Sequence, residues 1–206
     1  MAEKRERKSL QSPIGIATFV HLFDPFAFKA TATRAAKDPN YSVMMVFLPD
    51  AVKSEQMRAL KLACVEAAET KFGVDARVKI KRFLAGKKGG IAVPWREASD
   101  YEQYGEPFTI EGATMINFKS NTAPGIVDSR AQPIMDKKQI YAGCKMRVSF
   151  GVWPYDTDGS KGVTLLLNNV QKAGDGPKLA GRADAEEEFE SIDGDDDSDD
   201  GGDDDI

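Results

Sequence analysis

The stretch Cys144-Lys-Met-Arg-Val-Ser-Phe-Gly-Val-Trp-Pro-Tyr155 carries the clearest strand pattern in the chain. Successive side chains of a β-strand point to opposite faces of the sheet. The even positions, from Met146 to Val152, are apolar and predict a side that faces the core. The odd positions predict an exposed side with two cations and two aromatic rings, namely Lys145, Arg147, Trp153 and Tyr155.

An exposed strand face that combines rings with cations is typical of proteins that bind single-stranded nucleic acid. Bases stack on aromatic rings while cations contact the phosphates, and stacking is worth about 1–3 kcal/mol per base whatever the sequence. Because bases are free to stack only when unpaired, this face favours single strands over duplex. The alternative is an ordinary solvated strand face whose Trp and Tyr cover one end of a barrel.

The neighbouring sequence predicts further strands and one main helix. A hairpin loop at 156–162 leads to a strand within 163–170, and apolar runs predict earlier strands at 14–23, 41–48 and 108–118. The first of these is expected to be covered on both sides, with His21 as a core residue, and Gly112 is expected to bend the last. Helical spacing over 51–72, closed by Gly73, predicts an amphipathic helix. We therefore expect a mainly β fold, a small closed or nearly closed β-barrel with one main helix.

Two further segments supply candidate nucleic-acid contacts. Residues 77–83 alternate basic and apolar, which predicts a second strand with a basic face, and a glycine-rich loop follows it. The contact candidates here are Arg77, Lys79, Lys81, Lys87 and Lys88. In an irregular segment, Trp95, Arg96, Tyr101 and Tyr104 either form a mobile rim of the binding groove or pack a loop onto the body.

The charge of the chain is divided between a basic body and an acidic end. Residues 183–206 hold fourteen acids and no base; without them the 33 acids fall to 19 against 28 bases, so residues 1–182 carry about +9. Acidic runs of this length are expected to be disordered. We expect a flexible arm at 1–12, one domain at 13–182, and a disordered tail that competes with polyanions for the basic body.

Several classes of function find little support in the sequence. There is no phosphate-binding loop motif, the single histidine has no nucleophile motif around it, and the carboxylates of the body do not cluster. We therefore expect no enzyme activity, no metal site and no cofactor. No apolar run approaches 18 residues and the N-terminus lacks a secretion signal, so we expect a cytoplasmic chain. In that compartment Cys64 and Cys144 are expected to be buried thiols.

Several motifs resemble those of a phage family of single-stranded DNA-binding proteins, formerly a family of unknown function. They are Asn117-Phe-Lys-Ser120, Gly125-Ile-Val-Asp128, Tyr141-Ala-Gly-Cys144, the strand that ends at Tyr155, and Lys161-Gly-Val-Thr-Leu-Leu-Leu-Asn-Asn-Val-Gln171. The resemblance covers about residues 12–192, including the acid-rich end after Gly181. Phe118, Lys119 and Tyr141, which lie within these motifs, complete the candidate DNA-binding set.

The resemblance implies an OB-fold elaborated by extra elements, and binding of single-stranded DNA during phage replication, recombination or repair in the host cell. Acidic tails of similar proteins end in a hydrophobic residue and dock onto partner enzymes. In this chain Asp203, Asp204, Asp205 and Ile206 occupy that position, with Ile206 in place of the commoner aromatic residue. The alternatives are an acidic-tailed interaction or assembly protein, and a metal-dependent nuclease. Preference for DNA over RNA and assembly into homo-oligomers are left open.

Overall fold

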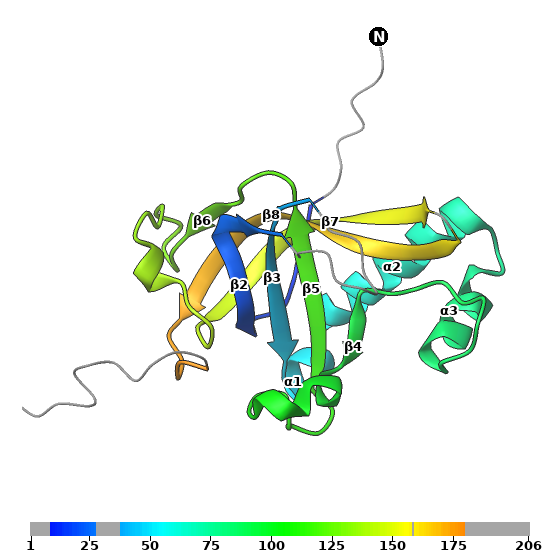
Figure 1. Ribbon diagram of the computed structural model, residues 1–206, viewed down its shortest axis with the longest axis horizontal. Coiled ribbons are helices and arrows are strands. Elements are labelled where there is room, and N and C mark those ends of the chain that lie inside the picture. Colours follow the sequence, from blue (N-terminus) through cyan, green and yellow to red (C-terminus); the bar gives the residue numbers. More distant parts are fainter. Residues whose placement is uncertain (1–8, 28–37, 158, 180–206) are drawn as a thin grey trace, which may run out of the picture.

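A computed structural model describes residues 9–27, 38–157 and 159–179 of the chain (Figure 1). Its strands are β1 (Leu10–Gln11), β2 (Gly15–Phe26), β3 (Asn40–Phe47), β4 (Trp95–Glu97), β5 (Thr114–Ser120), β6 (Gly125–Val127), β7 (Lys145–Thr157) and β8 (Ser160–Gly174). Its helices are α1 (Pro49–Val52), α2 (Glu55–Phe72) and α3 (Ala76–Leu84), with 3-10 helices η1 (Ala98–Tyr104) and η2 (Lys137–Gln139).

Five strands close into a barrel. β2 pairs with β3, β3 with β5, β5 with β8, β8 with β7, and β7 again with β2. Only the β5–β8 pair of this ring is parallel. The short strands β1, β4 and β6 extend the sheet beside β7, β5 and β8. A five-stranded Greek-key barrel of this kind is an OB-fold, so the predicted fold class is confirmed.

The barrel encloses the apolar sides of its strands. Met146, Val148 and Phe150 of β7 are buried, as the even positions predict. The ring of Phe150 meets that of Phe118 from β5, with 5.4 Å between ring centroids. β5 and β7 lie on either side of β8, so this contact fixes the inward-facing sides of these two strands.

Helix α2 packs against β7, at the back of the barrel in the view of Figure 1. It begins at Ser54, whose Oγ accepts a hydrogen bond from the backbone N–H of Met57, and it ends at Gly73, with φ 85°. Its buried residues are Met57, Leu60, Cys64 and Ala68, which recur at helical spacing. The predicted main helix is therefore confirmed.

The strand predicted at 77–83 is wrong, because these residues form most of helix α3. Basic and apolar residues alternate there, but Ala76 and Ile80, four residues apart, are the two that are buried. Lys and Arg also favour helix over strand. The pattern was too short for its period to decide between the two.

Several other boundaries differ from the expectation. The hairpin loop predicted at 156–162 is shorter, because β7 runs to Thr157 and β8 begins at Ser160, and the main helix begins at Glu55. β5 begins at Thr114, and Gly112 lies in the preceding turn with φ 75°, so the strand predicted at 108–118 starts too early. Leu10 and Gln11, expected in a flexible arm, pair with β7, and the Oγ of buried Ser12 accepts a hydrogen bond from Val148 N–H. Residues 1–8 and the predicted tail, 183–206, lie outside the described residues.

Within the described ranges no helix is long and apolar enough to cross a membrane. The same residues contain no group of three or more His, Cys, Asp or Glu placed to hold a metal ion.

Both cysteines are free and buried, as predicted, which yields a labelling test. Burial raises the pKa of Cys64 to about 12 and also raises that of Cys144. Because the thiolate is the reactive form, we expect neither thiol to react with a disulfide reagent in the native protein at pH 8, and both to react in denaturant. Ser129→Cys, on an exposed loop, supplies the rate of an accessible thiol. Native labelling as fast as this control would contradict the burial.

Candidate nucleic-acid interface

The outer faces of β3 and β5 form the floor of a groove. Ser42 and Met44 of β3 and Asn117 and Lys119 of β5 point away from the core, because their chain neighbours are the buried core residues. The register places Ser42 opposite Lys119 and Met44 opposite Asn117. These four side chains therefore form one continuous patch on the outside of the barrel.

Three adjoining hollows open over this floor, and Asn117 lines all of them. The hollow toward β2, of about 470 Å³, is also lined by Phe19, His21, Phe26 and Tyr104. The hollow toward the β7–β8 hairpin, of about 570 Å³, is also lined by Arg96, Tyr155 and Thr164. The third lies between them, beside Tyr101. Together they form one groove that crosses the barrel from β2 to the β7–β8 hairpin.

A β-bulge builds the β2 wall of this groove. Phe19 has φ 45°, and the pairing of β2 with β3 shifts register between Thr18 and His21. The bulge reverses the alternation of side chains, so Ala17 and Leu22 both face the core. The prediction that this strand is covered on both sides is wrong, and so is the core position of His21. His21 is half-buried in the groove wall and stacks on Phe26, with centroids 4.5 Å apart.

The segment that follows β4 forms the adjoining wall. Phe108, Ala113 and Met115 make a second small core with Val46 and Ala98 on the outside of β3 and β5. On top of it, the ring of Tyr104 meets Phe19 edge-on with 5.2 Å between centroids, and Tyr104 is 54% exposed. The segment is therefore packed onto the barrel, as the second interpretation predicts, while exposed Tyr104 lines the groove.

Trp95 and Arg96, adjacent in β4, point to different places. Arg96 lines the groove and, among the described residues, makes no ion pair. Trp95 packs against the core instead, with Nζ of Lys61 from α2 5.7 Å from its ring centroid. The structure thus keeps Arg96 in the candidate site and places Trp95 outside it.

The two ends of β7 lie in different surroundings. Tyr155 lines the groove, and its ring crosses Gly162 of β8 so closely that a Cβ there would lie 2.6 Å from Tyr155 Cζ. Trp153, on the same side of the strand, is 47% exposed opposite Thr164. Arg147 lies eight residues from Tyr155, about 26 Å along the strand. Its Nε donates a hydrogen bond to Gln171 Oε1 at 2.7 Å. The predicted alternation of buried even and exposed odd positions is confirmed, but Arg147 and Lys145 do not line the groove.

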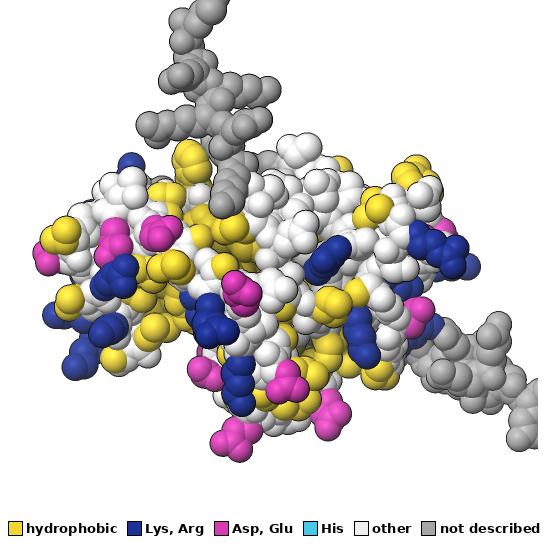
Figure 2. All heavy atoms as spheres, turned by 180° about the vertical axis from the view of Figure 1, so that it is seen from behind, with side chains coloured by type: hydrophobic (Ala, Val, Ile, Leu, Met, Phe, Trp, Pro, Cys, Tyr) yellow, Lys and Arg dark blue, Asp and Glu magenta, His cyan; other side chains and the backbone are white. Residues whose placement is uncertain are grey.

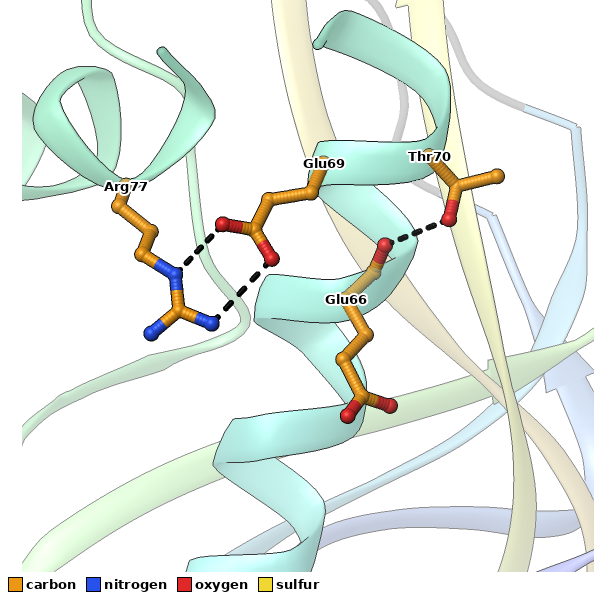
Figure 3. Close-up of polar contacts among 4 residues, drawn as sticks. All are labelled: Glu66, Glu69, Thr70 and Arg77. Atoms are coloured by element: carbon orange, nitrogen blue, oxygen red, sulfur yellow. Dashed lines mark hydrogen bonds and ion pairs between the residues drawn. The ribbon is translucent and has the colours of Figure 1, made fainter. Parts of the chain in front are cut away.

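The basic residues of α3 and of the loop after it do not line the groove either. The guanidinium of Arg77 makes a two-pronged ion pair with Glu69 of α2, at 2.5 and 3.2 Å (Figure 3). The hydrogen bonding from Arg77 holds the pKa of the Glu69 carboxyl below its usual value. Lys79 is half-buried, and Lys81, Lys87 and Lys88 are exposed. Phe83 is the residue of α3 that reaches the groove.

Two of the motif residues serve the fold rather than the groove. Phe118 is completely buried, because it occupies a core-facing position of β5, so its predicted surface role is wrong. The hydroxyl of half-buried Tyr141 donates to Asp175 Oδ1 at 2.9 Å and so ties the segment after β8 to the barrel. The tail candidates Asp203, Asp204, Asp205 and Ile206 lie outside the described residues.

The charge of the groove is positive. Its described lining residues include Arg96 and Lys119 and no Asp or Glu. On the face seen from behind in Figure 2, acidic and hydrophobic side chains interrupt the Lys and Arg side chains. A basic groove walled by aromatic rings can hold an unpaired polyanion with flat substituents, which is the chemistry of a single-stranded nucleic acid.

The sequence analysis missed several residues of this groove, including Phe19, Phe26, Ser42, Met44 and Asn117. The bulge that turns the β2 residues outward leaves no signature in the apolar pattern. Ser42 and Asn117 interrupt otherwise apolar strand segments, and that interruption was the one available signal.

Comparisons with known proteins identify a family and similar folds. A family model described as the ssDNA-binding protein of Enterobacter phage Enc34 matches residues 16–200. The structure of the Enc34 protein in complex with ssDNA is similar, with TM-score 0.64 and 14% identity over 82% of this chain and 88% of that one. The structure of gp2.5, a single-stranded DNA-binding protein of bacteriophage T7, has TM-score 0.57 and 18% identity over 89% and 95%. A search of curated proteins found no significant match.

The close approach of Tyr155 to Gly162 yields a packing test. Gly162→Ala places a Cβ against the Tyr155 ring and the Cβ of Ala92, so we expect a loss of about 1–3 kcal/mol in unfolding free energy, measured in urea. Gly151→Ala in β7 is the matched control, because nothing lies within 4 Å of its added Cβ. Equal stability of the two variants would show that the Tyr155 ring does not lie across β8.

Proposed function

The chain belongs to the family of the Enterobacter phage Enc34 ssDNA-binding protein, and on that basis we propose that it binds and protects single-stranded DNA without requiring a particular sequence. The observation that carries the proposal is the groove over β3 and β5, whose lining, as far as the structure describes it, holds aromatic rings, Arg96 and Lys119 but no Asp or Glu. In OB-folds the face of the second and third strands binds oligonucleotides, and β3 and β5 are the second and third strands of this barrel.

The rings of the groove favour unpaired bases. Phe26, Tyr104 and Tyr155 belong to walls at both ends of the groove, so bases must leave a helical stack to contact them. Followed around the outside of the barrel from β2 through β3, β5 and β8 to β7, the groove passes four strand spacings, about 19 Å of surface. We therefore place the site at the lower end of the range of about 4–16 nucleotides known for OB-folds.

We further propose that the protein acts in phage replication, recombination or repair by occupying exposed single strands, and that it is a binding protein and not an enzyme. In this proposal residues 183–206, with their fourteen acids, compete with DNA for the cations of the groove. Asp203, Asp204, Asp205 and Ile206 are then the segment that contacts partner proteins.

The cations of the groove provide a direct test. Lys119→Ala and Arg96→Ala should each weaken binding of oligo(dT), and should lower the slope of log affinity against log salt concentration by about 0.7, because one phosphate contact is lost. Fluorescence anisotropy at several salt concentrations measures both effects.

Arg77→Ala is the matched control, since Arg77 is paired with Glu69 outside the groove. A duplex of equal length should bind more weakly than oligo(dT). Equal binding of the two would instead favour an interaction protein without single-strand preference.

Removing residues 183–206 tests the competition. The shortened chain should bind oligo(dT) more tightly and keep that binding at higher salt, because the cations of the groove no longer face a competing polyanion. A flexible chain of this length reaches about 25–30 Å, enough to return to a small domain. Equal affinity of the full and the shortened chains would exclude the competition.

A further inference from the structure

Asn117 occupies the centre of the groove. It lies in the middle of β5, is exposed, and lines each of the three hollows. Within the described residues its side-chain amide has no hydrogen-bond partner; the amides of Asn168, Asn169 and Gln171, also exposed or half-exposed on the barrel, all have one. Asparagine is disfavoured in strands, so neither strand propensity nor packing accounts for it there.

The surroundings of Asn117 suit a flat ring with a polar edge. The hollow toward β2 has the stacked pair of His21 and Phe26 on one side, with Phe26 42% exposed, and Tyr104 on another. Polar atoms come from the floor, where Ser42, opposite Lys119, lies diagonally from Asn117. An aromatic wall and an amide floor match the face and the edge of one nucleobase.

We propose that Asn117 hydrogen-bonds the pairing edge of one unpaired base, and that this contact contributes to the choice of single strands over duplex. The inference rests on the proposed binding of single-stranded DNA in this groove. A carboxamide places one acceptor beside two donors. Each of the four bases presents donors and acceptors side by side on its pairing edge, and a half-turn of the amide exchanges its own donor and acceptor. Asn117 thus accepts any base, provided that the edge is not already paired.

The test blocks the pairing edge of the base with a methyl group and keeps its aromatic ring. The probes are a short oligo(dT), about six nucleotides long, and the same oligomer with N3-methylthymine at every position, compared by fluorescence anisotropy. Wild-type protein should bind the unmethylated oligomer about two- to tenfold more tightly, the value of one hydrogen bond. Asn117→Leu keeps the volume of the side chain but removes the amide, so this ratio should fall toward one.

Each result separates the inference from the proposal on which it rests. An unchanged affinity ratio in Asn117→Leu would show that the methyl group acts by steric exclusion. A ratio of one in the wild type would show that the protein makes no hydrogen bond to the pairing edge. Either result overturns the inference and leaves DNA binding intact. Failure of the wild type to bind either oligomer overturns the proposed function itself.

Asn168→Leu serves as the matched control, because Asn168 is an exposed asparagine of β8 that does not line the groove. It should leave the ratio at the wild-type value. A fall in the ratio in this control as large as in Asn117→Leu would also overturn the inference, because the effect would then not be specific to the groove.

Discussion

The double pairing of β7, with β2 at one end and with β8 along its length, is the constraint on which the groove depends. This pairing closes the barrel, and the even side of β7 then fills it with Met146, Val148 and Phe150. The contact of Phe150 with Phe118 fixes the inner side of β5. Because side chains alternate along a strand, burying Phe118 exposes its neighbours Asn117 and Lys119. The chemistry of the groove floor thus follows from the packing of the core.

The walls of the groove depend on local departures from that alternation. The bulge at Phe19 brings Phe19 and His21 to the outer side while Ala17 and Leu22 remain inside. The missing side chain of Gly162 lets the Tyr155 ring lie across β8. A regular five-stranded barrel would present a shallower and more open face, with fewer rings above the floor. Bulges often occur near binding sites because they redirect side chains in this way.

The same physics explains what the sequence could predict. A long alternating run predicted which residues of β7 face the core, and helical spacing with a terminal glycine predicted α2. In both cases the pattern repeats several times along the segment. The segment 77–83 was too short for that, and the burial of Ile80 and of the preceding Ala76 accompanies the packing of α3 against α2. The sequence also could not show which basic side chains are paired with other side chains. Arg77 and Arg147 are as basic as Arg96, but Glu69 and Gln171 occupy their guanidinium groups.

Charge alone does not account for a preference for single strands. A duplex carries one negative charge per about 1.7 Å of its axis and releases more counterions per contact than a single strand does. Lys119 and Arg96 taken by themselves would therefore attract a duplex at least as well. Preference for unpaired DNA must come from groups that a duplex cannot satisfy, namely rings that need a free base face and an amide that needs a free base edge. In the proposed binding mode Phe26, Tyr104 and Tyr155 supply the first. Asn117, which lines the groove together with both cations, supplies the second.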